Sequence, residues 1–139
     1  QEAAFCWRGL PIPVIAVLHG RCYGGGVQIA LGADFRFATP ECELSILEAN
    51  GGLVPDMSGT ITLRELLPID QAKLLTMTGR MFDGNEALRL GLVTGVSPDP
   101  MALAEALVEA GHEVTVICPA PNRPSLRRFL SHQTSIHPK

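Results

Sequence analysis

Short apolar segments separated by glycine and proline are the main pattern along the chain. Residues Val14–Leu18 are apolar without interruption and lie between Pro13 and Gly20, which is typical of a strand buried on both faces. The triplet 24–26 is all glycine, and apolar residues then continue up to Gly32. This pattern predicts a strand, a glycine turn and a short helix in succession.

The next part of the chain predicts further short elements. Alternating apolar and polar residues indicate strands at 35–38 and 43–46, and glycines with Pro55 indicate a loop from 51 to 60. Asp83, followed three residues later by Glu86, forms a capping box at the start of a helix. Helices are expected at 2–9, 60–67, 70–78, 83–90 and from residue 100 onward.

The segment after Gly111 allows two interpretations. Residues 113–117 are rich in β-branched side chains that alternate as in a strand, yet an apolar stripe at helical spacing also runs across Gly111. We favour the helix. A last basic helix is expected at 125–131, where Arg127 and Arg128 stand between apolar residues.

Composition and charge limit the possible classes of protein. With 139 residues, 46% hydrophobic and 18% charged, the chain suits one globular domain with one core, spanning residues 1–139. A net charge of −3 disfavours a nucleic acid as partner. No apolar run approaches the roughly 20 residues of a membrane-spanning helix. We therefore expect no membrane partner and a cytoplasmic location.

The four cysteines form no C-x-x-C pair, and histidines and cysteines are scattered. Neither a zinc site nor a redox dithiol is indicated, and no metal site is expected. Free, buried thiols are the simplest interpretation.

The glycine triplet is the sharpest candidate for chemistry. A strand that leads through Gly24, Gly25 and Gly26 into a helix leaves backbone N–H groups unpaired at one point, which attracts an anion or a developing oxyanion. The triplet lacks the Lys and the Ser or Thr of a phosphate-binding loop, and Ile29 departs from the dinucleotide-binding pattern. The alternative is that small residues simply let the helix pack close to the strand.

Two acidic residues stand near predicted loops. Glu48 follows a predicted strand, Asp56 lies in the glycine-rich loop, and both have apolar neighbours in sequence. Apolar surroundings disfavour a charged carboxylate, so such a group can hold and release a proton near neutral pH. The two acids could move a proton between neighbouring atoms of one substrate. The alternative for each is a solvated turn or cap.

With these residues in view, the chain resembles the crotonase superfamily, the enoyl-CoA hydratases and isomerases. The first matching stretch runs from Pro13 to Ala38 and contains the glycine triplet, and the second runs from Glu48 to Thr60. Shorter matches follow at 78–80, 86–87 and 91–93. These stretches keep the family's order and spacing over about residues 1–110.

The resemblance implies an α/β fold, a partial crotonase-like spiral of β-β-α units with C-terminal helices. Residues 1–98 would be the remainder of the spiral core, and 99–139 a C-terminal helical region that is only weakly family-like. Family chains are considerably longer, so this chain resembles the C-terminal part of the domain. The family assembles as homotrimers or hexamers, and it uses acyl-CoA thioesters as substrates without a separate cofactor.

The resemblance also implies a binding site for the thioester. Its members stabilise the thioester enolate with two backbone N–H groups, and Gly25 matches the residue that supplies one of them. Gly24, Gly26 and Gln28 are the neighbouring oxyanion and substrate-binding candidates. The other N–H belongs to the part of the family domain that precedes this chain.

The positions of the acidic residues distinguish two reactions within the family. Family hydratases use two glutamates; here Gln28 replaces the first, and Glu48 matches the second. Because glutamine cannot exchange a proton at neutral pH, hydration is disfavoured. Relatives that shift a double bond use an acid at the position of Asp56. The resemblance thus favours isomerisation, with Glu48 and Asp56 sharing the base and acid roles in either order.

Two other classes remain as alternatives. A non-catalytic crotonase-fold assembly subunit, or a truncated pseudoenzyme, would also explain Gln28 and the shorter chain. A peptidase on the same fold would need a serine beside the glycines, and this chain has none there.

Overall fold

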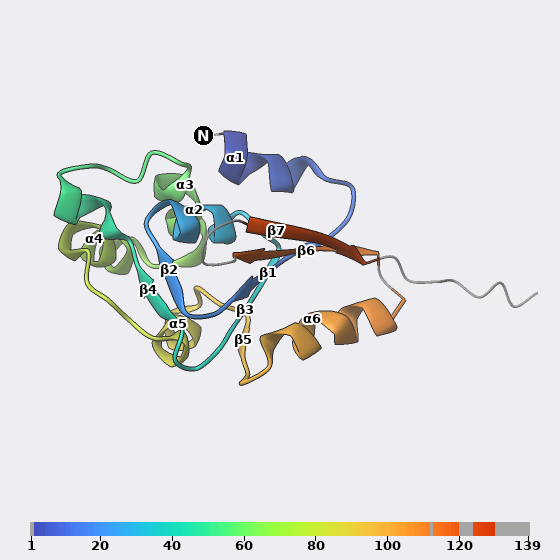
Figure 1. The fold of residues 1–139 in the computed structure, drawn as a ribbon. Helices are drawn as coiled ribbons and strands as arrows, with labels where there is room; N and C mark the ends of the chain where they lie inside the picture. The colour runs from blue at the N-terminus through green and yellow to red at the C-terminus, as the bar shows by residue number, and fades with distance from the viewer. Residues whose placement is uncertain (1, 112, 120–123, 130–139) are drawn as a thin grey trace, which may run out of the picture.

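A five-stranded sheet forms the centre of the protein (Figure 1). The computed structural model describes residues 2–111, 113–119 and 124–129. The strand order is β5-β3-β1-β6-β7, with β7 antiparallel to β6 and the other pairs parallel. These strands are β1 (Val14–Leu18), β3 (Phe35–Ala38), β5 (Gly95–Val96), β6 (Val114–Pro119) and β7 (Pro124–Phe129). A separate parallel pair joins β2 (Arg21–Tyr23) to β4 (Glu43–Ser45).

The helices agree with most of the predicted ones. Asp83 is confirmed as the N-cap of α5, because the Glu86 N–H donates to its carboxylate at 2.7 Å, while the Glu86 carboxylate accepts from Arg80 at 2.7 Å. The helical elements are α1 (Glu2–Phe5), η1 (Cys6–Gly9), α2 (Gly25–Leu31), η2 (Leu47–Gly51), α3 (Gly59–Leu66), α4 (Ile69–Thr78), α5 (Gly84–Leu90) and α6 (Pro100–Glu109). Here η1 and η2 are 3₁₀ helices.

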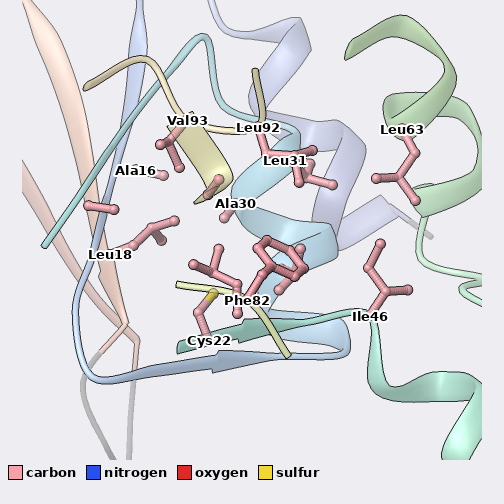
Figure 2. Close-up of a cluster of buried hydrophobic side chains, with 14 of the residues drawn as sticks. Ala16, Leu18, Cys22, Ala30, Leu31, Ile46, Leu63, Phe82, Leu92 and Val93 are labelled. Carbon is pink, nitrogen blue, oxygen red and sulfur yellow. The ribbon is translucent and has the colours of Figure 1, made fainter. Parts of the chain in front are cut away.

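Alternate side chains of β1 enter two different hydrophobic clusters, because successive residues of a strand point to opposite faces. Ile15 and Val17 pack in the cluster that α6 covers. Ala16 and Leu18 belong to the larger cluster on the other face, together with residues of β2, α2 and α3 (Figure 2). The continuous apolar run of β1 therefore has the predicted cause: both faces of the strand are buried.

The predicted helix at 113–117 is wrong, because these residues lie in β6. Helix α6 stops at Glu109, and Gly111 adopts φ +92°, which ends the helical path. Strand β6 then pairs with β1, and Val116 is 0% exposed in the cluster below α6. Burial of β-branched side chains beside β1 outweighs the helical stripe.

The predicted basic helix at 125–131 is also wrong over its described part. Residues Pro124–Phe129 form β7, whose backbone pairs with β6 in the register Val116 to Arg127. This pairing satisfies backbone groups at the edge of β6 that a helix would leave unpaired. Of the expected C-terminal helical region 99–139, the helix at 100–109 is confirmed, while 112, 120–123 and 130–139 lie outside the described residues.

Candidate active site

The glycine turn joins β2 to α2. Gly24 has φ +52° and ψ −120°, a conformation that side chains strongly disfavour, and its N–H donates to the Ser45 carbonyl at 2.9 Å. A Cβ built on Gly24 would lie 3.4 Å from Oε1 of Glu48. This is an ordinary contact distance, so the backbone angles and not the available space require glycine here, and the Glu48 carboxyl lies beside the turn. Because the Gly24 N–H is already paired, this amide is not available to a substrate.

The next amides of the turn are better placed for a ligand. The N–H groups of Gly25 and Gly26 belong to the first turn of α2, where no intrahelical carbonyl can accept them. Gly25 is half-buried and Gly26 is exposed, so the turn does not face the packed interior. Met57 lies over it, since its sulfur is 3.1 Å from a Cβ built on Gly25.

A hydrogen-bonded chain links Glu48 to two helices. Gln28 of α2 is 2% exposed, and its Nε2 donates to Glu48 Oε1 at 2.5 Å. The backbone N–H of Gly59, the first residue of α3, donates to Gln28 Oε1 at 3.0 Å. The amide of Gln28 therefore connects the start of α3 with the carboxyl on η2.

The second carboxylate oxygen of Glu48 has different surroundings. Oε2 is buried and accepts no hydrogen bond within the described part of the chain. A buried carboxylate oxygen without a donor is unfavourable, so this atom is an acceptor for a ligand that can donate to it. The arrangement places one carboxyl beside the glycine turn.

Asp56 lies in a different environment from the one that the sequence predicted. It is exposed, and Leu53 and Val54 in the same loop are 67% and 72% exposed, so its surroundings are not apolar. Only its neighbour Met57 reaches the turn. The structure thus brings Glu48, Gln28 and the glycines together and leaves the Asp56 side chain at the surface.

The contacts of Gln28 and Gly59 were missed by sequence reasoning. The sequence indicates Gln28 as a replacement for an acid and as a substrate-binding candidate, but not as a partner of Glu48. The Gly59 N–H leaves no signal because a backbone amide does not show in the side-chain pattern. The parallel pairing of β2 with β4, with Tyr23 opposite Ser45, brings the ends of both strands together. This register explains why residues 24 and 48 meet.

Other predicted features have mixed outcomes. Cys22 and Cys42 are buried free thiols as expected, whereas Cys6 is exposed. In the described ranges, no group of three or more His, Cys, Asp or Glu could hold a metal ion. No helix among the same residues is long and apolar enough to cross a membrane.

The family model for enoyl-CoA hydratase/isomerase matches residues 7–121, most of the chain. The chain belongs to the enoyl-CoA hydratase/isomerase family. Solved structures of this crotonase group agree with the assignment. An enoyl-CoA hydratase from Thermoplasma volcanium GSS1 is 32% identical, with a TM-score of 0.74, over 80% of this chain and 44% of that one. The crotonase-type α/β fold is thereby confirmed.

A second structure carries a ligand. A candidate enoyl-CoA hydratase from Thermobifida fusca YX, in complex with acetoacetyl-CoA, is 37% identical with a TM-score of 0.66, over 69% of this chain and 38% of that one. An enoyl-CoA hydratase from Mycobacterium smegmatis is 30% identical with a TM-score of 0.67, over 73% of this chain and 40% of its own. The present chain therefore spans about two fifths of the length of these family structures.

Proposed function

We propose that the protein binds acyl-CoA thioesters and shifts the double bond of a 3-enoyl-CoA to the 2-position. The observation that carries this proposal is the Glu48 carboxyl held against the glycine turn, with no donor to Oε2 among the residues that the structure describes. Structures of similar proteins in complex with acetoacetyl-CoA and with CoA support the substrate class.

In the proposed reaction, Glu48 and Asp56 share the two proton transfers. The Asp56 side chain is exposed in the structure, so it would have to turn toward the bound substrate to take part. One of the two acids removes a proton from the carbon next to the thioester carbonyl, and the electron pair moves onto the carbonyl oxygen. The Gly25 N–H donates to this developing oxyanion, a contact worth about 3–4 kcal/mol in comparable enzymes. A proton is then added at C4, the far carbon of the original double bond, while the electron pair returns from the oxygen and leaves the double bond between C2 and C3. The atoms balance without a co-reactant.

Gln28 is the reason to favour isomerisation over hydration. Hydration adds water across the double bond, and a second acid beside Glu48 would assist that step. The Gln28 amide instead occupies this place and has both polar ends engaged, by Glu48 and by the Gly59 N–H. Among the described residues, Glu48 is then the carboxyl that lies at the turn before substrate binds.

The proposal is tested by incubating the protein with 3-enoyl-CoA and following the ultraviolet absorbance of the conjugated thioester. Parallel reactions with 2-enoyl-CoA report hydration. We expect isomerisation to be the faster reaction, with a loss of about 100-fold or more in Glu48→Gln and a loss in Asp56→Asn. Asp70→Asn, an exposed acid on α4, is the matched control. If Glu48→Gln and Asp56→Asn leave both rates unchanged, the acid and base roles are wrong.

A non-catalytic assembly subunit is the second candidate, favoured by Gln28 in place of an acid and by the two-fifths span of the family structures. It predicts a homotrimer or hexamer by sedimentation with no binding of a CoA thioester by calorimetry. Measurable binding of acetoacetyl-CoA would contradict this candidate and support the enzyme.

A further inference from the structure

The Gln28 amide has a bonding pattern that a carboxylate could not provide. The Gly59 N–H can only donate, so the oxygen of the Gln28 amide faces it, and the NH₂ group faces Glu48. A charged glutamate at position 28 could accept from Gly59, but it would place one carboxylate against another. The amide satisfies the backbone group and the carboxylate at the same time.

We propose that Gln28 is a positioning residue that fixes the Glu48 carboxyl and selects Oε2 as the oxygen that carries the proton. This inference rests on the proposed function of Glu48. A protonated carboxyl keeps its carbonyl oxygen as the better acceptor and bears the proton on the other oxygen. Because Gln28 donates to Oε1, a proton that the carboxyl takes up from the substrate is placed on Oε2.

Burial makes this selection effective. Gln28 is 2% exposed and therefore beyond the easy reach of water that could replace its bond to Glu48. Its two hydrogen bonds join α2 to η2 and to the start of α3, so three elements hold the carboxyl in one orientation. Both Glu48 oxygens stay close to the turn, at 3.4 and 3.9 Å from a Cβ built on Gly24. The Glu48 carboxyl is therefore held beside the turn whose Gly25 N–H is proposed to bind the thioester oxygen.

The first test measures Glu48 in the protein without substrate. Carbon-13 NMR relaxation of the Glu48 methylene groups is compared between the wild type and Gln28→Met, which keeps the side-chain length but removes both hydrogen bonds. We expect a rigid Glu48 in the wild type and the mobility of an exposed glutamate, such as Glu41, in Gln28→Met. Gln71→Met is the matched control, since the Gln71 amide bonds only to Asp70 at 3.4 Å.

A second variant separates positioning from folding. Gln28→Glu can still accept from the Gly59 N–H, but its charged form cannot donate to Glu48. We expect Gly59 amide exchange to stay protected while Glu48 becomes mobile. This variant also gives the answer if Gln28→Met does not fold. If Glu48 remains as rigid in the folded Gln28 variants as in Gln71→Met, the positioning role is wrong.

Kinetic measurements then test whether the positioning of Glu48 by Gln28 affects the rate of isomerisation. In the isomerisation assay we expect Gln28→Met to lower kcat about 10- to 100-fold with KM changed less than about threefold. Adding Gln28→Met to Glu48→Gln should cost little more, because both changes act on one group. Fully additive losses would overturn the inference. Absence of turnover in the wild type with a rigid, Gln28-dependent Glu48 would contradict the proposed function but not the positioning.

Discussion

At the scale of single residues, Gly59 is constrained by a side chain and not by its backbone conformation. Its backbone has no positive φ, but a Cβ at this position would lie 2.7 Å from Oε1 of Gln28. We predict that Gly59→Ala displaces the Gln28 amide and lowers the free energy of unfolding by about 1–3 kcal/mol through overpacking. Urea denaturation measures the change, and mobility of Glu48 should rise in parallel.

Gly26→Ala is the matched control for this prediction. A Cβ on Gly26 would meet only the Cys22 sulfur at 3.8 Å, an ordinary contact, and alanine favours the helix by about 0.5–1 kcal/mol. We expect unchanged or slightly increased stability. If Gly59→Ala and Gly26→Ala lower the free energy of unfolding equally, the close contact between residue 59 and Gln28 does not destabilise the variant, and the prediction is wrong.

The residue types of the candidate site could be predicted from the sequence, but only some of their surroundings could be. The run of glycines and the isolated Glu48 are visible in the chain, and the structure brings them together. The exposure of Asp56 was not predictable, because apolar neighbours in sequence, such as Leu53 and Val54, are themselves exposed in the loop. Sequence neighbours do not determine burial in a loop that has no periodic pattern.

At the scale of elements, β6 is where local pattern and tertiary packing disagree. The sequence of 113–117 fits a helix and a strand, and the decision comes from β1, whose edge accepts a parallel partner. Strands β2 and β5 were not predicted because they have three and two residues, and so few residues cannot show the alternating pattern of a strand. The long segments with clear caps, such as α5 and α6, were predicted correctly.

The placement of β6 can be tested through Val116, which is 0% exposed against the α6 side of the sheet. We predict that Val116→Ala lowers the free energy of unfolding by about 1.5–3 kcal/mol, because a buried valine loses apolar contact. Val54→Ala is the control, since Val54 is 72% exposed and its truncation should change stability by less than about 0.5 kcal/mol. A small effect of Val116→Ala, equal to that of Val54→Ala, would contradict the position of β6.

At the scale of the whole molecule, the two hydrophobic clusters on opposite faces of the sheet account for the layered α/β fold that the family resemblance implies. The apolar run of β1 and the helices around it require a layered α/β arrangement, since β1 has to be covered on both sides. The glycine turn lies at the boundary of the larger cluster, where α2 leaves β2. The site is thus positioned by the same packing that defines the fold.

Two buried thiols of the larger cluster, Cys22 and Cys42, make the free energy of unfolding depend on pH in the alkaline range. Burial, with a smaller contribution from Cys42, raises the pKa of Cys22 to about 12, and burial, with Glu41 and Glu43 nearby, raises the pKa of Cys42 to about 11. A raised pKa in the folded protein means that the unfolded chain loses these protons first. Above about pH 8.5–9 the free energy of unfolding should therefore fall, by up to about 1.4 kcal/mol per pH unit for each thiol.

This prediction is checked by urea denaturation at several pH values between about 8 and 10.5. The protein with Cys22→Ala and Cys42→Ala should show a shallower fall with pH than the wild type, because two groups no longer titrate on unfolding. Val54→Ala, which truncates an exposed side chain that does not ionise, should leave the slope unchanged. Other groups that ionise in this range, such as Tyr23, are present in all three proteins, so they do not affect the comparison. The same slope in the double variant and the wild type would mean that Cys22 and Cys42 ionise as readily in the folded protein as in the unfolded chain, which their burial in the structure does not allow.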